Sequence, residues 1–346
     1  MKPLDTSANP ILVTHSRGGI TESFHRGILC VVNSSGEIIL SMGDTSQWCF
    51  PRSALKYFQH IPLIVSGAFD HFGFTLKELA LMCGSHNGEA MHTETAEGIL
   101  QKIGMQVSDL GCGAQPPTHK KDYLNLIYAG KEPTAIHNNC SGKHAGFLAW
   151  CKFMNASTSN YLDFEHPLHK EIKKYTALFH EIPESELVIG LDGCSAPIFG
   201  MPVYNQALAY KNLVNPITFS EDVQRACNLI AEAVTTYPEM IAGSKRYCTD
   251  LIKSTGGAII GKTGADGIYS LAIPSKKWGI TIKIDDGRMG PQYNVAQYLL
   301  EALKLVDEKV AAELHSYLSL ELKNWAGHTT GMSEISQQLR DLNVNI

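Results

Sequence analysis

The sequence lacks the apolar segments by which proteins are exported or held in a membrane. Residues 1–7 contain no apolar run of the kind that forms a signal peptide, and no stretch reaches the length of a membrane-spanning helix. There is also no internal repeat, no low-complexity tract and no linker rich in Pro, Gly or Ser. These absences predict a cytoplasmic protein that folds as one domain over residues 1–346.

An excess of positive charge is missing too. The chain has 29 Lys and Arg against 34 Asp and Glu, a net charge of −5, and its basic residues are scattered. A nucleic-acid partner would require a basic face, so the charge pattern argues against one. With 44% hydrophobic and 18% charged residues, the composition is that of an ordinary globular protein with a substantial core.

Paired cysteine motifs are absent, although the chain has nine cysteines. Without a Cys-x-x-Cys spacing, the sequence offers neither a zinc ribbon nor a thioredoxin-type motif. In a chain that shows no export signal, cysteines are expected as thiols rather than disulfides. Taken by themselves, they are best explained as small buried hydrophobic side chains.

Two segments match the letters of known motifs but not their structural requirements. Residues 256–263 fit the Walker A pattern, yet an apolar Ala-Ile-Ile occupies the loop and a strand follows where the phosphate-binding mechanism needs a helix. His92-Thr-Glu94 resembles the His-x-Glu of zinc deaminases, but the Pro-Cys-x-x-Cys partner is missing. We therefore exclude both a P-loop and a deaminase centre.

Strand patterns at the two ends of the chain predict an α+β fold. Apolar runs at 27–32 and 37–42 flank the turn-forming residues 33–36, which indicates a β-hairpin. Three further runs, at 257–262, 267–273 and 278–285, predict consecutive antiparallel strands. We expect the hairpin and these strands to join in one antiparallel sheet with flanking helices.

The region between them reads as mostly helical, with one short strand at 186–190. Thr75-Leu-Lys-Glu78 is a capping box, which predicts a helix that runs to about Cys83. Residues 105–138 are expected to be irregular. The other helices are expected to start at Pro51 and to span 93–104, 147–153, 166–180, 219–237 and 291–306.

The stretch from Cys49 to Lys56 contains a Ser-x-x-Lys spacing, Ser53 to Lys56. Pro51 suits the start of a helix, and residues three apart on a helix share a face. A serine nucleophile needs a base within reach and N–H groups that stabilise an oxyanion, and the first turn of a helix can supply both. By itself the spacing is weak evidence, because it also occurs at ordinary solvated helix starts.

Two further segments strengthen this interpretation. Ser85-His86-Asn87 lies in a loop after a helix, and Lys262-Thr263-Gly264 lies at the end of a strand. The order Ser-x-x-Lys, Ser-x-Asn, Lys-Thr-Gly is the motif set of serine β-lactamases and penicillin-binding proteins. It predicts two Ser/Lys pairs around one carbonyl group. A second lysine would help to keep the catalytic lysine neutral.

Other polar residues are ambiguous from the sequence alone. Cys140, Lys143 and Cys194 are most simply two core thiols and a surface lysine, because lysine is a rare metal ligand. Asp192 can be a turn residue and Arg52 a solvated charge.

Together these segments resemble the L-asparaginase II family of rhizobial-type enzymes. Cys140-Ser-Gly-Lys-His144 and Asp192-Gly-Cys194 are the most specific segments, and the resemblance covers about residues 12–290. Asn87 departs from the pattern, because serine is expected there, and the chain beyond about 310 matches least. The matching stretches also include Arg17-Gly-Gly-Ile20, Arg52-Ser53-Ala-Leu-Lys56, Ala80-Leu-Met-Cys-Gly-Ser85-His86, Pro238-Glu-Met240, Arg246-Tyr-Cys-Thr249 and Gly261-Lys262-Thr-Gly-Ala-Asp266.

The resemblance implies a serine-β-lactamase-like and glutaminase-like fold, and hydrolysis of L-asparagine to L-aspartate and ammonia. It implies Ser53 as nucleophile with Lys56, and Ser85 with Lys262 as the second pair. It also implies that Asp192 lies in the site, that the enzyme is a homodimer, and that zinc is bound nearby. The implied zinc ligands are Cys140, Lys143 and Cys194.

The substrate contacts can be specified further. Asp192 is a candidate for binding the α-ammonium group, and Arg52 either binds the α-carboxylate or has a structural role. Two alternatives remain open: a β-lactamase or penicillin-binding-protein-like serine hydrolase, and a non-catalytic, zinc-stabilised binding protein of the same fold.

Overall fold

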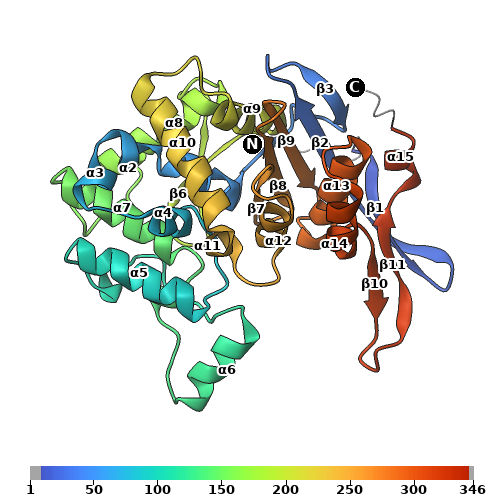
Figure 1. Cartoon of the computed structure of the whole chain (residues 1–346), viewed down its shortest axis with the longest axis horizontal. Helices are drawn as coiled ribbons and strands as arrows, with labels where there is room; N and C mark the ends of the chain where they lie inside the picture. Colours follow the sequence, from blue (N-terminus) through green and yellow to red (C-terminus); the bar gives the residue numbers. More distant parts are fainter. Residues whose placement is uncertain (1–8, 343–346) are drawn as a thin grey trace. The chain divides into compact units, whose positions relative to one another are not determined.

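The computed structural model describes residues 9–342 (Figure 1). The chain divides into two compact units, and the expectation of one catalytic domain over 1–346 stays a prediction. The first, which we call the sheet unit, takes the residues up to 54, residues 201–212 and the residues from 254 onward. The second, the helical unit, takes residues 55–200 and 213–253. Each unit is therefore built from segments that are distant in sequence.

One antiparallel sheet dominates the sheet unit, and it confirms the expected α+β class. The strand order is β10-β11-β1-β2-β9-β8-β7, and β3 pairs with β2. The N-terminal hairpin joins the later strands through the β2–β9 pairing, in which Cys30 lies opposite Thr281. The strands are β1 (Ile11–Arg17), β2 (Ile20–Val32), β3 (Ile38–Met42), β7 (Ile260–Gly264), β8 (Ile268–Ile273), β9 (Trp278–Ile284), β10 (Leu320–Lys323) and β11 (Thr329–Ile335).

The predicted hairpin turn between β2 and β3 is present. The Gly36 N–H donates to the Asn33 carbonyl at 3.0 Å, and the Asn33 side-chain oxygen accepts from the backbone N–H groups of Ser35 and Glu37. Gly36 has a φ of 90°, which a residue without Cβ adopts at low cost. Local turn chemistry therefore fixes this register.

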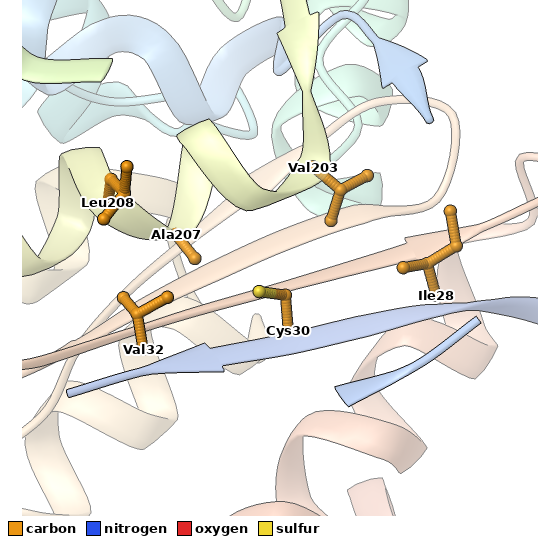
Figure 2. Packing of buried hydrophobic residues seen from close by; sticks show 6 residues of the cluster. All are labelled: Ile28, Cys30, Val32, Val203, Ala207 and Leu208. Atoms are coloured by element: carbon orange, nitrogen blue, oxygen red, sulfur yellow. The ribbon is translucent and has the colours of Figure 1, made fainter. Parts of the chain in front are cut away.

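Helix α9 (Val203–Val214) covers part of the sheet, and the sequence reading missed it. Figure 2 shows its apolar side chains facing those of β2. A Cβ at Gly279 of β9 would lie 1.9 Å from the Ala207 carbonyl oxygen, so only glycine permits this close approach. The buried cluster contains Ile28, Cys30, Val32, Val203, Ala207 and Leu208.

The sheet unit also contains a short strand pairing outside the main sheet, three helices near the C-terminal strands and one 3₁₀ helix. β4 (Trp48–Cys49) pairs with the last residues of β6 (Pro197–Pro202). Helix α13 (Met289–Ala302) packs against β1, β8, β9 and β11, and α14 (Glu308–Leu318) packs on α13. α15 (Gln337–Arg340) follows the last strand, and the 3₁₀ helix η1 (Arg52–Leu55) leads into the helical unit.

In the helical unit, α7 (Ser141–Phe153) is buried along most of its length and packs against α4 and α5. Two glycines of α7 allow close contact with its neighbours. A Cβ at Gly142 would lie 2.6 Å from the Leu81 carbonyl oxygen of α4, and a Cβ at Gly146 would lie 2.8 Å from His60 Nε2. The other elements are α1 (Lys56–Gln59), α2 (Ile61–Val65), α3 (Ala68–His71), α4 (Leu76–Met82), α5 (Ala90–Lys102), η2 (Val107–Asp109), α6 (Lys120–Tyr128), η3 (Ala135–His137), α8 (Pro167–His180), β5 (Val188–Leu191), α10 (Glu221–Thr236), α11 (Pro238–Ala242) and α12 (Tyr247–Ser254).

Several boundaries differ from the sequence-based expectations. The helix expected from Pro51 begins as the 3₁₀ turn η1, and α5 begins at Ala90 rather than Thr93, because Glu89 and His92 form its capping box. α7 begins at Ser141, six residues before the expected start. α6 interrupts the region that we expected to be irregular, and none of its residues is buried. None of the helices within residues 9–342 is long and apolar enough to cross a membrane.

Candidate active site

Lys56 begins α1, and its side chain is almost completely buried, with 1% of the residue exposed. Its Nζ donates to Ser85 Oγ at 2.9 Å, to the Gly84 carbonyl oxygen, and to the Asn139 carbonyl oxygen at 3.4 Å. The structure thus joins one member of each expected Ser/Lys pair. A buried amine bonded to a serine hydroxyl can exchange a proton with it.

The loop that carries Ser85 is fixed on both sides. The expected capping box of Thr75 and Glu78 starts α4, which ends just before the loop. A Cβ at Gly84 would lie 2.3 Å from the Met240 carbonyl oxygen of α11, so the two backbones are in close contact. The Ser85 N–H then donates to the Ile241 carbonyl at 2.7 Å. This anchoring holds the Ser85 hydroxyl beside Lys56.

Ser53 lies in η1, within the sheet unit, and it is partly buried. Its segment packs on β7: a Cβ at Gly264 would lie 2.3 Å from the Pro51 carbonyl oxygen. The Tyr210 hydroxyl donates to the Ala54 carbonyl at 2.8 Å. Ser53 is therefore held on a constrained turn, immediately before the chain enters the helical unit at residue 55.

Lys262 lies on β7, whose residues are all buried. Its Nζ donates to the Thr263 carbonyl at 3.0 Å, and Thr263 Oγ1 is 3.1 Å from the Tyr293 hydroxyl. The Lys-Thr-Gly motif forms the last three residues of β7, so the strand continues two residues beyond its expected end at Lys262. The Ser53 segment packs against this same strand.

Arg52 forms an ion pair with Asp266, which follows β7. Arg52 also has a φ of 51°, an unusual backbone conformation for a residue with a side chain. The ion pair ties η1 to the end of β7 and gives Arg52 a structural contact.

The three residues expected to bind metal come together in the helical unit. Lys143 Nζ donates to Cys194 Sγ at 2.9 Å, and the thiol groups of Cys140 and Cys194 interact directly. All three residues are at most 4% exposed. The turn that follows β5 supplies Cys194, and the N-cap position of α7 supplies Cys140.

These groups strongly affect one another. The hydrogen bond with Cys194 holds the pKa of the Cys140 thiol well below its usual value, and the charges of Lys56 and Lys143 act in the same direction. The hydrogen bond from Cys140 and burial raise the pKa of Cys194. Burial opposes the charge on Lys143, but the sulfurs of Cys194 and Cys140 outweigh it and raise the pKa of this amine. The cluster therefore favours a thiolate next to an ammonium group.

Asp192 lies on the turn that carries Cys194. Its Oδ2 is 3.7 Å from Cys194 Sγ, and its Oδ1 accepts from the Gly193 N–H at 2.9 Å. The carboxylate also helps to raise the pKa of Lys143. The expected substrate residue thus adjoins the three expected metal ligands.

The donor set fits zinc once Lys143 loses its proton, because zinc accepts thiolate sulfur and neutral nitrogen ligands. Within residues 9–342, no three His, Cys, Asp or Glu side chains gather in a way that can hold a metal ion. A metal at this position therefore requires the lysine as its third protein ligand, as the resemblance implies.

Two buried histidines next to the motifs were not predicted. His86 Nδ1 accepts from the Gly88 N–H, so its Nε2–H donates to Ser141 Oγ at 2.9 Å. His144 Nδ1 lies 2.7 Å from the Tyr161 hydroxyl, which accepts from the Gly111 N–H. Burial lowers the pKa of both imidazoles, to about 4 for His144, so both are neutral near pH 7. Their only signal in the sequence is that each directly follows a motif residue.

Comparisons with known proteins extend this description. The model of the L-asparaginase II family matches residues 13–335. The fold is similar to a β-lactamase from Mycobacterium bovis (13% identity, TM-score 0.40, covering 84% of this chain and 95% of that one). It is also similar to the octameric penicillin-binding protein homologue from Pyrococcus abyssi (15% identity, TM-score 0.45, covering 81% of this chain and 73% of that one). A third similar structure is Mglu in its native form (14% identity, TM-score 0.44, covering 87% of this chain and 71% of that one). TM-scores this low support no conclusion about activity or assembly. No curated protein matches the chain.

Proposed function

Because this chain belongs to the L-asparaginase II family, we propose that it hydrolyses L-asparagine to L-aspartate and ammonia through an acyl-enzyme. The family match supports a hydrolase of this kind. The observation that carries the specific proposal is the buried hydrogen bond from Lys56 to Ser85, which brings a serine and a potential base together in motifs of the expected order.

In the proposed mechanism, Ser53 Oγ attacks the side-chain amide carbonyl while the neutral amine of Lys56 takes its proton. Backbone N–H groups, including that of Ser53, stabilise the oxyanion. The Ser85–Lys262 pair delivers a proton to the departing ammonia. Water then hydrolyses the aspartyl ester by the reverse proton transfers.

Asp192 is proposed to bind the α-ammonium group of asparagine, and Arg52 its α-carboxylate. The position of Asp192 beside the buried cysteine–lysine cluster supports its part of this assignment. Arg52 must release Asp266 to bind substrate in a bidentate manner, whereas a purely structural Arg52 keeps its ion pair.

We further propose that Cys140, Lys143 and Cys194 bind one zinc ion. When bound, zinc supplies a positive charge that can orient the polar groups of the substrate. The protein's own contribution is to gather two sulfurs and one amine from different segments, with Asp192 next to them.

The decisive experiment measures ammonia release from L-asparagine by the purified full-length protein, with nitrocefin hydrolysis as the parallel assay. Ammonia release without nitrocefin cleavage supports the proposal. Nitrocefin cleavage alone would favour the β-lactamase or penicillin-binding-protein alternative. Calorimetric binding of asparagine without turnover would favour a non-catalytic binding protein.

The homodimer and the cytoplasmic location belong to the same proposal. Light scattering on the purified protein tests the first, since a dimer has twice the chain mass of 37.9 kDa. Fractionation of cells that express the full chain tests the second.

A further inference from the structure

A cavity of about 400 Å³ lies in the sheet unit, where the start of α13 meets β1, β10, β11 and the end of α14. None of its lining residues belongs to the Ser/Lys motifs or to the cysteine cluster. The residues that matter for its chemistry are His15, Arg288, Gly290, Tyr293, Asn294 and Tyr317.

The charges at this cavity are unbalanced in favour of cations. Its lining contains Arg288 and His15 but no carboxylate. Behind the lining, the His25 ring packs edge-on against His15, with 4.6 Å between the ring centroids. Asp286 is shared by this group: its Oδ2 is 2.7 Å from His25 Nδ1, and its Oδ1 accepts from the Arg288 N–H at 3.0 Å. Asp286 thus contacts the ring of His25 and the backbone N–H of Arg288, and its charge also acts on His15.

The neighbours of His15 already oppose its positive charge. Burial lowers the pKa of His15, and the charges of His25 and Arg288 lower it further, whereas Asp286 raises it. An anion placed in the cavity would reduce the repulsion among these groups. The electrostatic arrangement therefore favours a negatively charged ligand.

The backbone at the cavity also favours an anion. Arg288 is the N-cap of α13, but no side chain caps this end and the first turn contains no acidic residue. The N–H groups of a first turn without side-chain acceptors attract negative charge. No atom lies within 4 Å of a Cβ built on Gly290, so a ligand can approach this turn.

Two nearby buried side chains have polar atoms without hydrogen-bond partners in the described structure. His25, which is 5% exposed, has an unpartnered Nε2, and Gln292, which is completely buried in the first part of α13, has both amide atoms unpartnered. Buried polar atoms in folded proteins are nearly always hydrogen-bonded to protein or to another molecule. Neither residue lines the cavity, so these atoms show buried polarity next to the site and not a contact with its ligand.

We propose that this cavity binds a small aromatic carboxylate. Its carboxylate lies among Arg288, His15 and the first turn of α13, and its ring lies against Tyr293 and Tyr317. The two tyrosine rings are nearly perpendicular, at 82° with 6.3 Å between centroids, so they form a corner that can enclose a flat group. Tyr293 also contacts Thr263 of the Lys-Thr-Gly motif, but the lining contains no residue of the Ser/Lys pairs, and the binding test does not depend on amidohydrolase activity.

The test titrates the full-length protein with benzoate, acetate and inorganic phosphate, and follows histidine side-chain signals by NMR and heat by calorimetry. We expect benzoate to saturate the site and to shift the His15 and His25 signals. Arg288→Gln should weaken benzoate binding by about tenfold or more, because it removes a charge-assisted contact. The matched control Lys276→Gln, an exposed lysine of the same unit that does not line the cavity, should leave the affinity unchanged.

A second variant tests the aromatic part. Tyr317→Leu should weaken benzoate but not acetate, with the thermal unfolding midpoint showing that the variant is folded. Phosphate binding more tightly than benzoate would overturn the carboxylate assignment. Absence of saturable benzoate binding up to about 50 mM, which corresponds to less than 2 kcal/mol of binding free energy, or an affinity unaffected by Arg288→Gln, would overturn the site itself.

Discussion

At the scale of single residues, three hydrogen bonds fix the side chain of Lys56. Its Nζ contacts the Ser85 hydroxyl and the carbonyl oxygens of Gly84 and Asn139. The two carbonyl oxygens can only accept a hydrogen bond, whereas the Ser85 hydroxyl can accept a proton and also pass one on. Of the three contacts, the one with Ser85 is therefore the one that can take part in proton transfer.

Ser53→Ala should abolish nearly all turnover of asparagine while leaving the fold intact, because the substitution removes only the proposed attacking oxygen. The measurement is ammonia release, with circular dichroism as the check on folding. Ser66→Ala, a partly buried serine outside the motifs, is the matched control and should retain full activity. A folded Ser53→Ala protein that keeps most of its activity would rule out Ser53 as the nucleophile.

Ser85→Ala and Lys262→Ala should each lower kcat by several orders of magnitude. Since the proposed pair acts as one proton relay, the double variant should be little worse than either single one. Steady-state kinetics of the three variants decide the matter. Losses that multiply fully in the double variant would mean that the two residues act independently.

Cys194→Ser should remove the zinc that we propose, because it takes away one of the two sulfur ligands. Lys143 and Cys140, which both contact the Cys194 sulfur, would be left as the remaining ligands. Elemental analysis should find about one zinc per chain in the wild-type protein and none in the variant. Calorimetry should show weaker asparagine binding by the variant. Wild-type protein that has never met a chelator and contains no zinc would refute the site.

At the scale of elements, local patterns predicted those parts of the fold that local interactions determine. The β2–β3 hairpin and the β7–β9 meander were predicted, because alternating apolar runs and turn residues specify both. Helix α9 and strand β11 were missed. The packing of α9 on Gly279 and the pairing of β11 with β1 both involve residues that are distant in sequence. A reading of local patterns does not detect such contacts.

The same limit applies to the candidate site. The sequence indicated Lys56, Ser85 and the Cys-Ser-Gly-Lys segment as candidates, because their spacing forms local motifs. It did not identify the Lys56–Ser85 contact or the His144–Tyr161 bond, which depend on how α1, α4 and α7 pack. Short motifs indicate candidate residues, whereas tertiary packing decides which of them meet.

Gly142→Ala should destabilise the protein by about 1–3 kcal/mol, because the new Cβ would clash with the Leu81 backbone and push α7 away from α4. The same shift would displace Cys140 and Lys143, so zinc content should fall with stability. Gly98→Ala on α5 is the matched control, since nothing lies within 4 Å of its added Cβ. It should stabilise by about 0.5–1 kcal/mol. Urea unfolding measures both, and equal effects would contradict the packing argument.

At the scale of the whole molecule, buried histidines set the response to acid. Burial lowers the pKa of His180 to about 4 and that of His169 to about 3, from an ordinary value of 6.5. Both are neutral in the folded protein, whereas the unfolded chain takes up protons below about pH 6.5. The stabilisation that these neutral histidines contribute is therefore fully present above about pH 6.5. As the pH falls below this value, the free energy of unfolding decreases by up to about 1.4 kcal/mol per pH unit for each histidine.

His180→Gln should flatten this dependence, because it removes one group that must remain unprotonated in the fold. Glutamine keeps an amide donor for the Thr176 carbonyl, which His180 Nδ1 contacts at 2.7 Å. Urea unfolding at pH 7, 6 and 5 measures the slope, and His328→Gln, at an exposed position, is the control. A slope identical to that of the wild-type protein would contradict the assignment.

The pairing of β1 with β11 has a consequence for biosynthesis. Val13 lies opposite Ile335, so the outer edge of β1 has no strand partner until residue 335 has left the ribosome. Contacts this distant in sequence form late, and an exposed strand edge can meanwhile pair with another chain. The nascent polypeptide thus carries an open edge throughout most of its translation. The yield of folded protein should consequently depend on the rate of translation and on chaperones that shield exposed strands. We expect this dependence to be stronger than the free energy of unfolding of the finished protein would suggest.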